Sequence, residues 1–307
     1  MPYTGDQLYG KEFEPHIELL AQQKTSLLRS RVAFKRVAHA EEAYFHQIQA
    51  LDAPTANADR HGDTPSREAV LLRRRVTPLP FEDGYLIDKP DVDRMVVSPQ
   101  NVIVQSLGSS FGRWIDDLLI TAAFANAATG KAGGTAVTFQ AESISLNGTT
   151  GGIKTTLGTL AVVSTPVTME LAKILAMAEI YDDANVPESD RKYWAITPKD
   201  KRSMMAITTI TSSDFTKGGR LDSGVIGNFN GFDFIVTTRL PKDAATSTAY
   251  RTLCWSEGGL GLAFIQDLSI SVDRRADKKN ATGVYATIDG GAVRVEGSKV
   301  HECLTVV

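Results

Sequence analysis

Residues 98–128 read SPQNVIVQSLGSSFGRWIDDLLITAAFANAA and carry the strongest helix signal in the chain. Ser98 is a suitable N-cap, and Pro99 fits the first turn, where a missing N–H costs nothing. Apolar side chains then recur at spacings of three and four, which predicts one buried face formed by Leu107, Phe111, Trp114, Ile115, Leu118, Leu119 and Ala122. Glycines in the first half lower the helix propensity and indicate a neighbouring segment packed close to the helix. Gly130 is expected to end it.

Before this helix, residues 34–80 are predicted to form a long two-stranded excursion. Apolar and aromatic residues up to Leu51 indicate one strand, and Val70–Val76 indicates the second. Between them, residues 52–65 contain almost no large apolar side chain. A lone hairpin is marginal in water, so we expect this one to be stabilised by packing on another chain.

After the helix, residues 130–260 are predicted to form a mixed unit, because helix and strand patterns alternate there. The expected elements are helices at 165–185 and 198–207, and strands at 193–197, 231–240 and 250–255. In the first of these helices, the side chains expected to face inward are Leu171, Ile174, Leu175 and Ala178.

The two ends of the chain give further expectations. Strand candidates at 260–273 and 283–295 are joined by a highly charged turn, which predicts a projecting hairpin, and residues 300–307 indicate a last strand. The first 30 residues are interpreted as an arm with one short helix that Pro15 can open.

Composition excludes several classes of protein. The 307 residues include 33 Lys and Arg against 36 Asp and Glu, and 42% are hydrophobic, so neither wholesale disorder nor strong autonomous binding of nucleic acid is expected. No apolar stretch approaches the roughly 20 residues that span a bilayer, and the polar N-terminus does not resemble a signal peptide. The two cysteines, Cys254 and Cys303, have no metal-like spacing, which favours a reduced, intracellular protein.

One motif suggests an enzyme. Residues 108–112 match G-x-S-x-G, so a serine hydrolase using Ser110 is an alternative interpretation. That chemistry needs the serine on a strained turn after a strand, with a histidine later in the chain, and only His301 lies downstream. A helical face of small residues is the simpler interpretation.

The charged residues suggest no other chemistry. His39 and His46 flank two glutamates, but no zinc-binding spacing is present, so we predict no metal, cofactor or catalytic site. Asp116 and Asp117 would point about 100° apart on a helix, so they favour a polar face or partners for arginines. The run Arg73–Arg75 lies in a predicted strand, where alternate side chains serve opposite surfaces, including interchain ion pairs.

The order of segments carries a resemblance. The matching stretches, in chain order, are 20–29, 61–65, 73–76, 86–95, 112–117, 212–214, 231–235, 259–263 and 267–285. With these stretches in this order, the chain resembles the major capsid proteins of tailed bacteriophages, which have the HK97-type fold. This resemblance implies an α+β fold with an N-terminal arm, an extended β-hairpin loop, a long spine helix and a mixed axial domain.

The resemblance also implies a division of the chain and a function. It assigns residues 1–33 to the arm, 34–84 to the extended loop (E-loop), 85–129 with 261–293 to the peripheral domain, and 130–260 with 294–307 to the axial domain. The implied function is a non-enzymatic subunit of an icosahedral head shell around double-stranded DNA. An encapsulin-like shell of a cellular compartment is the alternative within the same fold.

The implied partners follow from that function. They are further copies of the chain in hexamers and pentamers, a portal protein, packaged DNA without sequence specificity, and a decoration protein as an optional partner. The arm begins almost at Met1, so we expect a separate scaffolding protein. Residues 37–88 contain no lysine, so we expect a non-covalent shell without Lys–Asn cross-links. The location would be the virion, after assembly in the host cytoplasm, with no membrane.

Two sets of residues are proposed as sites. Those expected at contacts between subunits are His61, Asp63, Arg73, Arg74, Arg75, Asp116, Asp117, Arg274 and Asn280. Those expected to face DNA on the inner surface are Arg29, Arg31, Lys35 and Arg36, for which pairing with acidic neighbours is the alternative.

Overall fold

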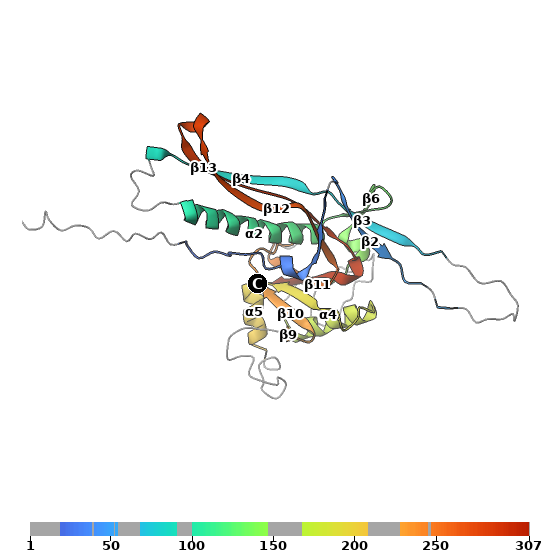
Figure 1. Ribbon diagram of the computed structural model, residues 1–307. Helices are drawn as coiled ribbons and strands as arrows, with labels where there is room; N and C mark the ends of the chain where they lie inside the picture. Colours follow the sequence, from blue (N-terminus) through green and yellow to red (C-terminus); the bar gives the residue numbers. More distant parts are fainter. Residues whose placement is uncertain are drawn as a thin grey trace, which may run out of the picture. The chain divides into compact units, whose positions relative to one another are not determined.

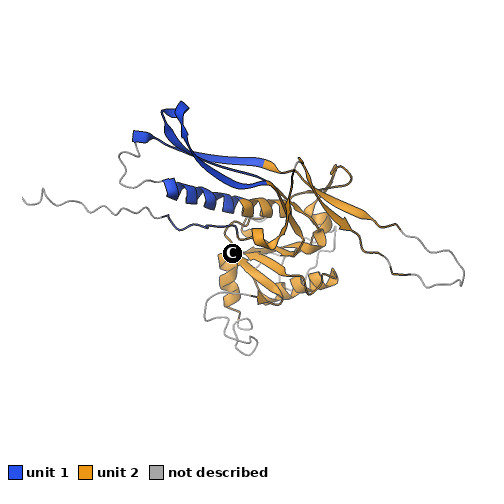
Figure 2. Cartoon of the chain, viewed as in Figure 1, with its two compact units in different colours: residues 1–26, 80–114, 266–289 blue, residues 27–79, 115–265, 290–307 orange. Residues whose placement is uncertain are grey.

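The computed structural model of the chain describes residues 19–38, 40–51, 53–54, 68–90, 100–146, 168–207, 228–244 and 247–306. The chain divides into two compact units, which Figure 2 distinguishes by colour. Unit 1 comprises residues 1–26, 80–114 and 266–289, and unit 2 comprises residues 27–79, 115–265 and 290–307. This division does not test the assignment of arm, loop, peripheral and axial segments, which remains a prediction.

The long central helix is confirmed as α2 (Gln100–Phe124) (Figure 1), and Ser98 and Pro99 lie outside the described residues. The helix does not extend to Gly130 as expected, because it ends at Phe124 and residues 127–129 form a strand. Its buried face differs from the expected one, because Trp114, Leu118 and Ala122 are only partly buried. The buried apolar positions are Leu107, Phe111, Ile115, Leu119, Ile120 and Ala123, and all of them except Ile120 follow a four-residue step along the helix. The close neighbour is found at Gly112, where a Cβ would lie 3.1 Å from the backbone nitrogen of Ser26.

Unit 1 also contains most of strand β4 (Leu79–Ile87) and the distal ends of β12 (Leu260–Arg275) and β13 (Ala281–Arg294). The short 3-10 turn η3 (Ala276–Lys278) joins β12 to β13 and forms the tip of the predicted hairpin. Strand order in this sheet is β1-β12-β13-β4. Strands β4 and β13 lie close together at Gly283, where a Cβ would be 3.5 Å from the Leu86 side chain.

Unit 2 is built around a six-stranded sheet with the order β7-β14-β11-β8-β10-β9. Its strands are β7 (Ser145–Leu146), β8 (Lys192–Ile196), β9 (Asn228–Phe229), β10 (Phe232–Val236), β11 (Ala249–Ser256) and β14 (Val300–Val306). Strand β8 is buried along its whole length, as the sequence predicts. Helix α5 (Pro198–Met205) follows it and begins at Thr197, where Thr197 and Asp200 form a reciprocal capping box.

Helix α4 (Leu171–Asp183) covers part of the core of unit 2 but presents a different face from the expected one. Ile174 is fully buried as predicted, whereas Leu175 is 53% exposed. The remaining inward positions are Met177, Ile180 and Tyr181, which pack with Trp194 and Phe232 of the sheet. Residues 165–167, where this helix was expected to begin, lie outside the described residues.

A second sheet of unit 2 has the order β2-β3-β5-β6. Its strands are β2 (Ala43–Ile48), β3 (Leu71–Val76), β5 (Ala127–Thr129) and β6 (Thr135–Val137), and α3 (Phe139–Glu142) follows. Strands β2 and β3 form the antiparallel ladder of the predicted excursion (Figure 1), and its tip at 55–67 lies outside the described residues.

The described part of the arm differs from the expectation. Residues 19–28 contain no helix, and the 3-10 turn η2 (Arg29–Arg31) comes next. Strand β1 (Ala33–Arg36) then pairs in parallel with the first residues of β12.

Candidate functional site at the base of the extended hairpin

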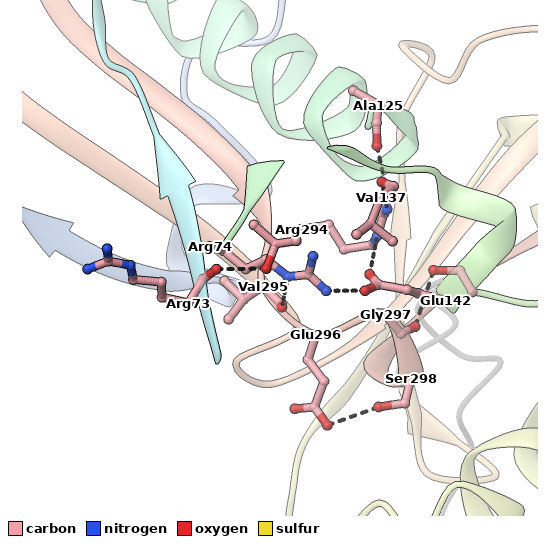
Figure 3. A network of polar contacts seen from close by, with 12 residues as sticks. Arg73, Arg74, Ala125, Val137, Glu142, Arg294, Val295, Glu296, Gly297 and Ser298 are labelled. Carbon is pink, nitrogen blue, oxygen red and sulfur yellow. Dashed lines mark hydrogen bonds and ion pairs between the residues drawn. The ribbon is translucent and has the colours of Figure 1, made fainter. Parts of the chain in front are cut away.

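The β2–β3 hairpin is anchored at its base by Arg74. Because side chains alternate along β3, Arg74 points into the protein and is only 6% exposed, whereas Arg73 and Arg75 point to the opposite side and are partly exposed. The Arg74 Nε donates a hydrogen bond to the backbone oxygen of Val295 at 3.1 Å, and its Nη2 is paired with the Glu142 carboxylate (Figure 3). One guanidinium therefore joins three segments that are distant in the sequence.

A second buried arginine shares the same carboxylate. Arg294 is 0% exposed, and its Nε lies 3.7 Å from Oε2 of Glu142. Its guanidinium donates hydrogen bonds to the backbone oxygens of Ala123 (2.8 Å), Ala125 (2.9 Å) and Val137 (3.1 Å). Burial lowers the pKa of Arg294, and the charge of Glu142 opposes that effect. Two buried cations therefore depend on one anion.

The outward arginines of β3 have partners of their own. Arg75 donates to Glu42 at 3.0 Å and to the backbone oxygen of Ala132 at 3.1 Å. The guanidinium of Arg73 lies 4.6 Å from the ring centroid of Tyr44 and donates to the backbone oxygen of Gly130 at 3.2 Å. The alternation predicted for this run is confirmed, and each of the three arginines has partners within the chain. Their role between subunits remains a prediction.

Beyond this anchored base, the stem of the hairpin exposes apolar side chains. Ile48, Leu51, Val70, Leu71 and Leu72, here called the apolar stem, are between 44% and 72% exposed. A hollow of about 700 Å³ beside the stem is lined by Ile48 and Leu72 on the hairpin and by Arg74, Glu142 and Gly297 at its base. An anchored strand pair with an apolar surface is suited to packing against another protein.

The two aspartates of α2 have different roles within the chain. Asp116 is 0% exposed, and its two carboxylate oxygens accept the backbone N–H groups of Leu27 and Leu28 at 3.1 Å each. Asp117 forms a bidentate ion pair with Arg239 and raises the pKa of that guanidinium. Their predicted orientation on different faces is thus observed, and their role between subunits remains a prediction.

The other residues proposed for contacts between subunits lie apart from the hairpin base. Arg274 is exposed in β12, next to the η3 tip, and Asn280 follows that tip in a left-handed conformation with φ 60°. His61 and Asp63 lie outside the described residues.

Three of the four cations proposed to face DNA contact rings or backbone oxygens of the chain. The Arg29 guanidinium lies 5.0 Å from the ring centroid of Phe264, and Lys35 donates to the backbone oxygen of Tyr44 at 2.8 Å. Arg31 bonds the backbone oxygen of Leu27, and Arg36 is exposed. Their contact with DNA remains a prediction.

The geometry does not support the serine hydrolase alternative. Residues 102–112 all lie within α2, so Ser110 is not on a turn between a strand and a helix. His301 is buried, its Nδ1 accepts the Ile144 N–H at 3.1 Å, and its Nε2 bonds the backbone oxygen of Ser298 at 2.9 Å.

Neither a cluster of metal ligands nor a membrane-spanning helix is found in the described part of the chain. Among the described residues, no three His, Cys, Asp or Glu side chains gather as metal ligands, and His39 lies outside that part of the chain. No helix of the described ranges has the length and apolar character needed to cross a membrane.

Sequence reasoning missed Glu142 and Arg294, which hold the hairpin base together with Arg74. Glu142 is the last residue of the single-turn helix α3, and Arg294 lies 220 residues from Arg74, so no local spacing links them. The one available signal was a charged residue at the end of the apolar run at 283–295 in a predicted strand.

The chain is similar to known phage capsid proteins in sequence and in structure. A family model described as phage capsid protein matches residues 6–307. The capsid structure of cyanophage P-SCSP1u is similar, with a TM-score of 0.72 and 18% identity over 98% of this chain and 94% of that chain. The capsid protein of cyanophage Pam1 has a TM-score of 0.71 and 13% identity over 99% of this chain and 98% of that chain. The capsid protein of Ralstonia phage GP4 has a TM-score of 0.70 and 13% identity over 99% of this chain and 97% of that chain.

No curated protein matches the chain. The structural similarities confirm the predicted α+β capsid fold, because they extend over nearly the whole of each chain. The family model likewise covers nearly every residue. The chain therefore belongs to the phage capsid protein family.

Proposed function

We propose that copies of this chain associate as pentamers and hexamers into the closed icosahedral head of a tailed phage, with the β2–β3 hairpin of each copy lying on a neighbouring copy. The family establishes the coarse role, a structural protein that forms a capsid shell. The arrangement of the copies, their contacts and their further partners are the proposal.

The observation that carries the proposal is the apolar stem. Five large apolar side chains are exposed on one short strand pair, including Ile48 and Leu71, which lie directly opposite each other. Burying each such side chain is worth roughly 1.5–3 kcal/mol. Because closed shells repeat one set of interfaces in every copy, a second copy is the partner that is always present in the right number.

The buried anchor supports this role. A hairpin that must reach a neighbour needs a fixed direction, and Arg74 ties β3 to Val295 and Glu142. Removing the anchor would leave the same apolar side chains on a strand pair without a defined orientation.

The remaining parts of the proposal concern the interior and the partners. We expect Arg36, with Arg29, Arg31 and Lys35, to face packaged double-stranded DNA. The formal net charge of −3 suits a shell that must release its contents. A portal protein, a separate scaffolding protein and a decoration protein are the expected partners. The shell would be non-covalent, without enzymatic activity, assembled in the host cytoplasm and retained in the virion.

The test is assembly of a stem variant. Ile48→Asp with Leu71→Asp places two carboxylates opposite each other on the stem without changing the buried base. We expect the variant to fold with an unchanged urea midpoint but to give at least tenfold fewer shells in negative-stain microscopy and light scattering. The control is Leu175→Asp, which changes an apolar residue of α4 that is 53% exposed, against 69% for Ile48 and 72% for Leu71, and it should assemble normally.

Two results would contradict the proposal. One is normal shell assembly by the stem variant. The other is failure of the unaltered chain to form any shell, with or without a co-expressed scaffolding candidate. A ladder of cross-linked chains on denaturing gels of unaltered shells would contradict only the non-covalent part.

A further inference from the structure

Unit 1 contains a small hollow between β4 and α2 that the proposed function does not use. Its volume is about 190 Å³, and it is lined by Phe81, Glu82, Asp83, Ser110, Phe111 and Trp114. The rings of Phe81 and Trp114 have centroids 4.5 Å apart at an interplanar angle of 50°. Phe111 meets Trp114 edge-on at 6.5 Å. The hollow is therefore an aromatic recess with carboxylates at its margin.

The carboxylates at this recess retain the capacity to bind a cation. Glu82 accepts the Tyr285 hydroxyl through one oxygen at 2.5 Å, and Asp83 accepts the Gly84 N–H through one oxygen at 2.9 Å. An ionised carboxylate offers about four acceptor positions, so both have positions left. Aromatic faces, tryptophan above all, attract ammonium and guanidinium groups, and the methylene stems of those side chains pack on rings.

We propose that this recess binds a basic side chain from the η3 tip of a second copy of the chain. The tip carries four cations, Arg274, Arg275, Lys278 and Lys279, beside Asp277. Arg275 is already paired with Asp277 at 2.9 Å. Among the residues that the structure describes, Arg274 and Lys279 have no hydrogen-bond or ion-pair partner, and Lys278 interacts electrostatically with Asp277. All three cations are exposed.

The tip of the same copy cannot reach the recess. In unit 1, Leu86 lies beside Gly283, close to the tip, whereas Phe81 lies five residues further along β4. At roughly 3.3 Å per residue, this places the recess about 17 Å down the strand from Leu86, and the tip extends the opposite way. The cation must therefore come from another molecule, and the complementary tip of another copy is present wherever the recess is.

The contact joins two different surfaces, so it is heterologous and passes from copy to copy around a ring. This inference rests on the proposed function, since it requires copies to be brought together. It adds a second, polar contact in unit 1 to the apolar contact proposed for the β2–β3 hairpin in unit 2.

The direct test is a disulfide between the two surfaces. Both native cysteines are fully buried, so Ser110→Cys with Lys279→Cys places the only accessible thiols at the recess and the tip. Mild oxidation of assembled shells should give a ladder of covalent oligomers on a non-reducing gel. Each single variant should give no ladder beyond dimers. A control pair, Ser110→Cys with Val272→Cys, places the second exposed thiol in β12 before the tip and should cross-link at least tenfold less.

Charge exchange gives an independent test. Glu82→Lys with Asp83→Lys reverses the recess, and Arg274→Glu, Lys278→Glu and Lys279→Glu reverse the tip. Either set alone should weaken each contact about 3-fold to 30-fold, the range expected for a cation on an aromatic face, and lower the salt concentration at which shells dissociate. Both sets of substitutions in one chain should restore the contact and the salt concentration at which shells dissociate. Arg275→Gln, which removes a cation already paired in its own copy, should have a smaller effect.

The outcomes separate this inference from the proposed function. If unaltered shells form but the cysteine pair gives no ladder and neither reversal changes dissociation, the contact is absent and the shell role stands. If the tip reversal alone weakens the shell, while the recess reversal is neutral and the double reversal does not rescue, the tip binds something else, such as DNA, and the inference is wrong. If the unaltered chain forms no shell, the proposed function fails first.

Discussion

At the scale of single residues, the hairpin base depends on one carboxylate between two buried arginines. Glu142 faces Arg74 on one side and Arg294 on the other (Figure 3). Replacing a complete buried ion pair can be neutral, but removing one partner leaves an uncompensated charge and is strongly destabilising. The three members of this group should therefore respond unequally to substitution.

We expect Glu142→Gln to be the most damaging change at this site. It leaves two buried guanidinium groups without a counter-ion and should lower the free energy of unfolding by about 3–5 kcal/mol. Arg74→Met leaves Arg294 and Glu142 as a balanced pair and should cost less, about 1–3 kcal/mol. Urea unfolding of the unassembled chain measures both. Equal losses would show that charge balance does not govern the site.

His301 predicts a pH dependence. Its burial lowers its pKa from the ordinary 6.5 to about 4, against a hydrogen bond to Ser298 that opposes the shift. The ring packs against Tyr181, whose own pKa is raised by burial so that it stays neutral. The histidine therefore binds a proton more readily in the unfolded chain than in the folded chain. The contribution of neutral, buried His301 to the free energy of unfolding is complete above pH 6.5 and is lost as the pH falls to about 4. The full loss is about 3 kcal/mol.

The measurement is urea unfolding at several pH values between 7.5 and 4 for the natural chain and for His301→Gln. Carboxylates titrate in both proteins, so the difference between the two curves isolates the histidine. That difference should change steadily from pH 6.5 downwards, in the direction that destabilises the natural chain. A difference that stays constant would show that His301 is not protonated on unfolding.

At the scale of the elements, the described part of the arm is held by polar contacts from side chains of α2 and β11, most of them to the backbone of the arm. In unit 2, Asp116 accepts two successive backbone N–H groups, and Trp255 donates to the backbone oxygen of Arg31 at 2.8 Å. In unit 1, Arg113 donates to the Gln22 side chain at 2.8 Å, and Gly112 leaves space for the passing backbone. Residues 22–31 of the arm are thus held by these contacts, although the described residues 19–28 form no helix.

Asp116→Asn is expected to loosen the arm. The amide NH₂ group would face one of the two backbone N–H donors and leave that donor without an acceptor. This should lower the free energy of unfolding by about 1–3 kcal/mol. Trypsin should then cut faster after Lys24 and Arg29. The matched control is Asp117→Asn at the next position, whose partly exposed ion pair should be worth no more than about 1 kcal/mol. Equal cleavage rates in the two variants would contradict the role assigned to Asp116.

The elements themselves were largely predictable from the sequence, but their faces were less so. The apolar period predicts α2, and the continuous apolar run of YWAIT predicts the buried strand β8. Periodicity alone could not distinguish Leu175 from Ile174, because both are apolar and adjacent, and the packing of α4 on the sheet decides between them. The described residues 19–28 do not form the helix expected there for a similar reason, since Asp116 accepts the backbone N–H groups of Leu27 and Leu28 in place of helical partners.

At the scale of the whole molecule, the capsid fold could be predicted from an ordered set of weak motifs, whereas the polar network could not. Arg74, Glu142 and Arg294 come from three distant parts of the sequence and meet only when the fold is complete. The run Arg73–Arg75 predicted which arginine would differ from its neighbours but not its partner. The aromatic recess has the same character, because Phe81 and Trp114 come together only through the packing of β4 on α2.

The place of β14 in its sheet has a consequence for biosynthesis. This strand lies between β7 and β11 and aligns with β11 over seven residue pairs from Val300 to Val306, although it follows every other described strand of the sheet in the sequence. The sheet cannot close until those residues have been translated, so unit 2 should finish folding only after synthesis has passed them. A subunit truncated before residue 300 would lack an interior strand. Incomplete translation products would thus be kept out of growing particles by their own failure to fold.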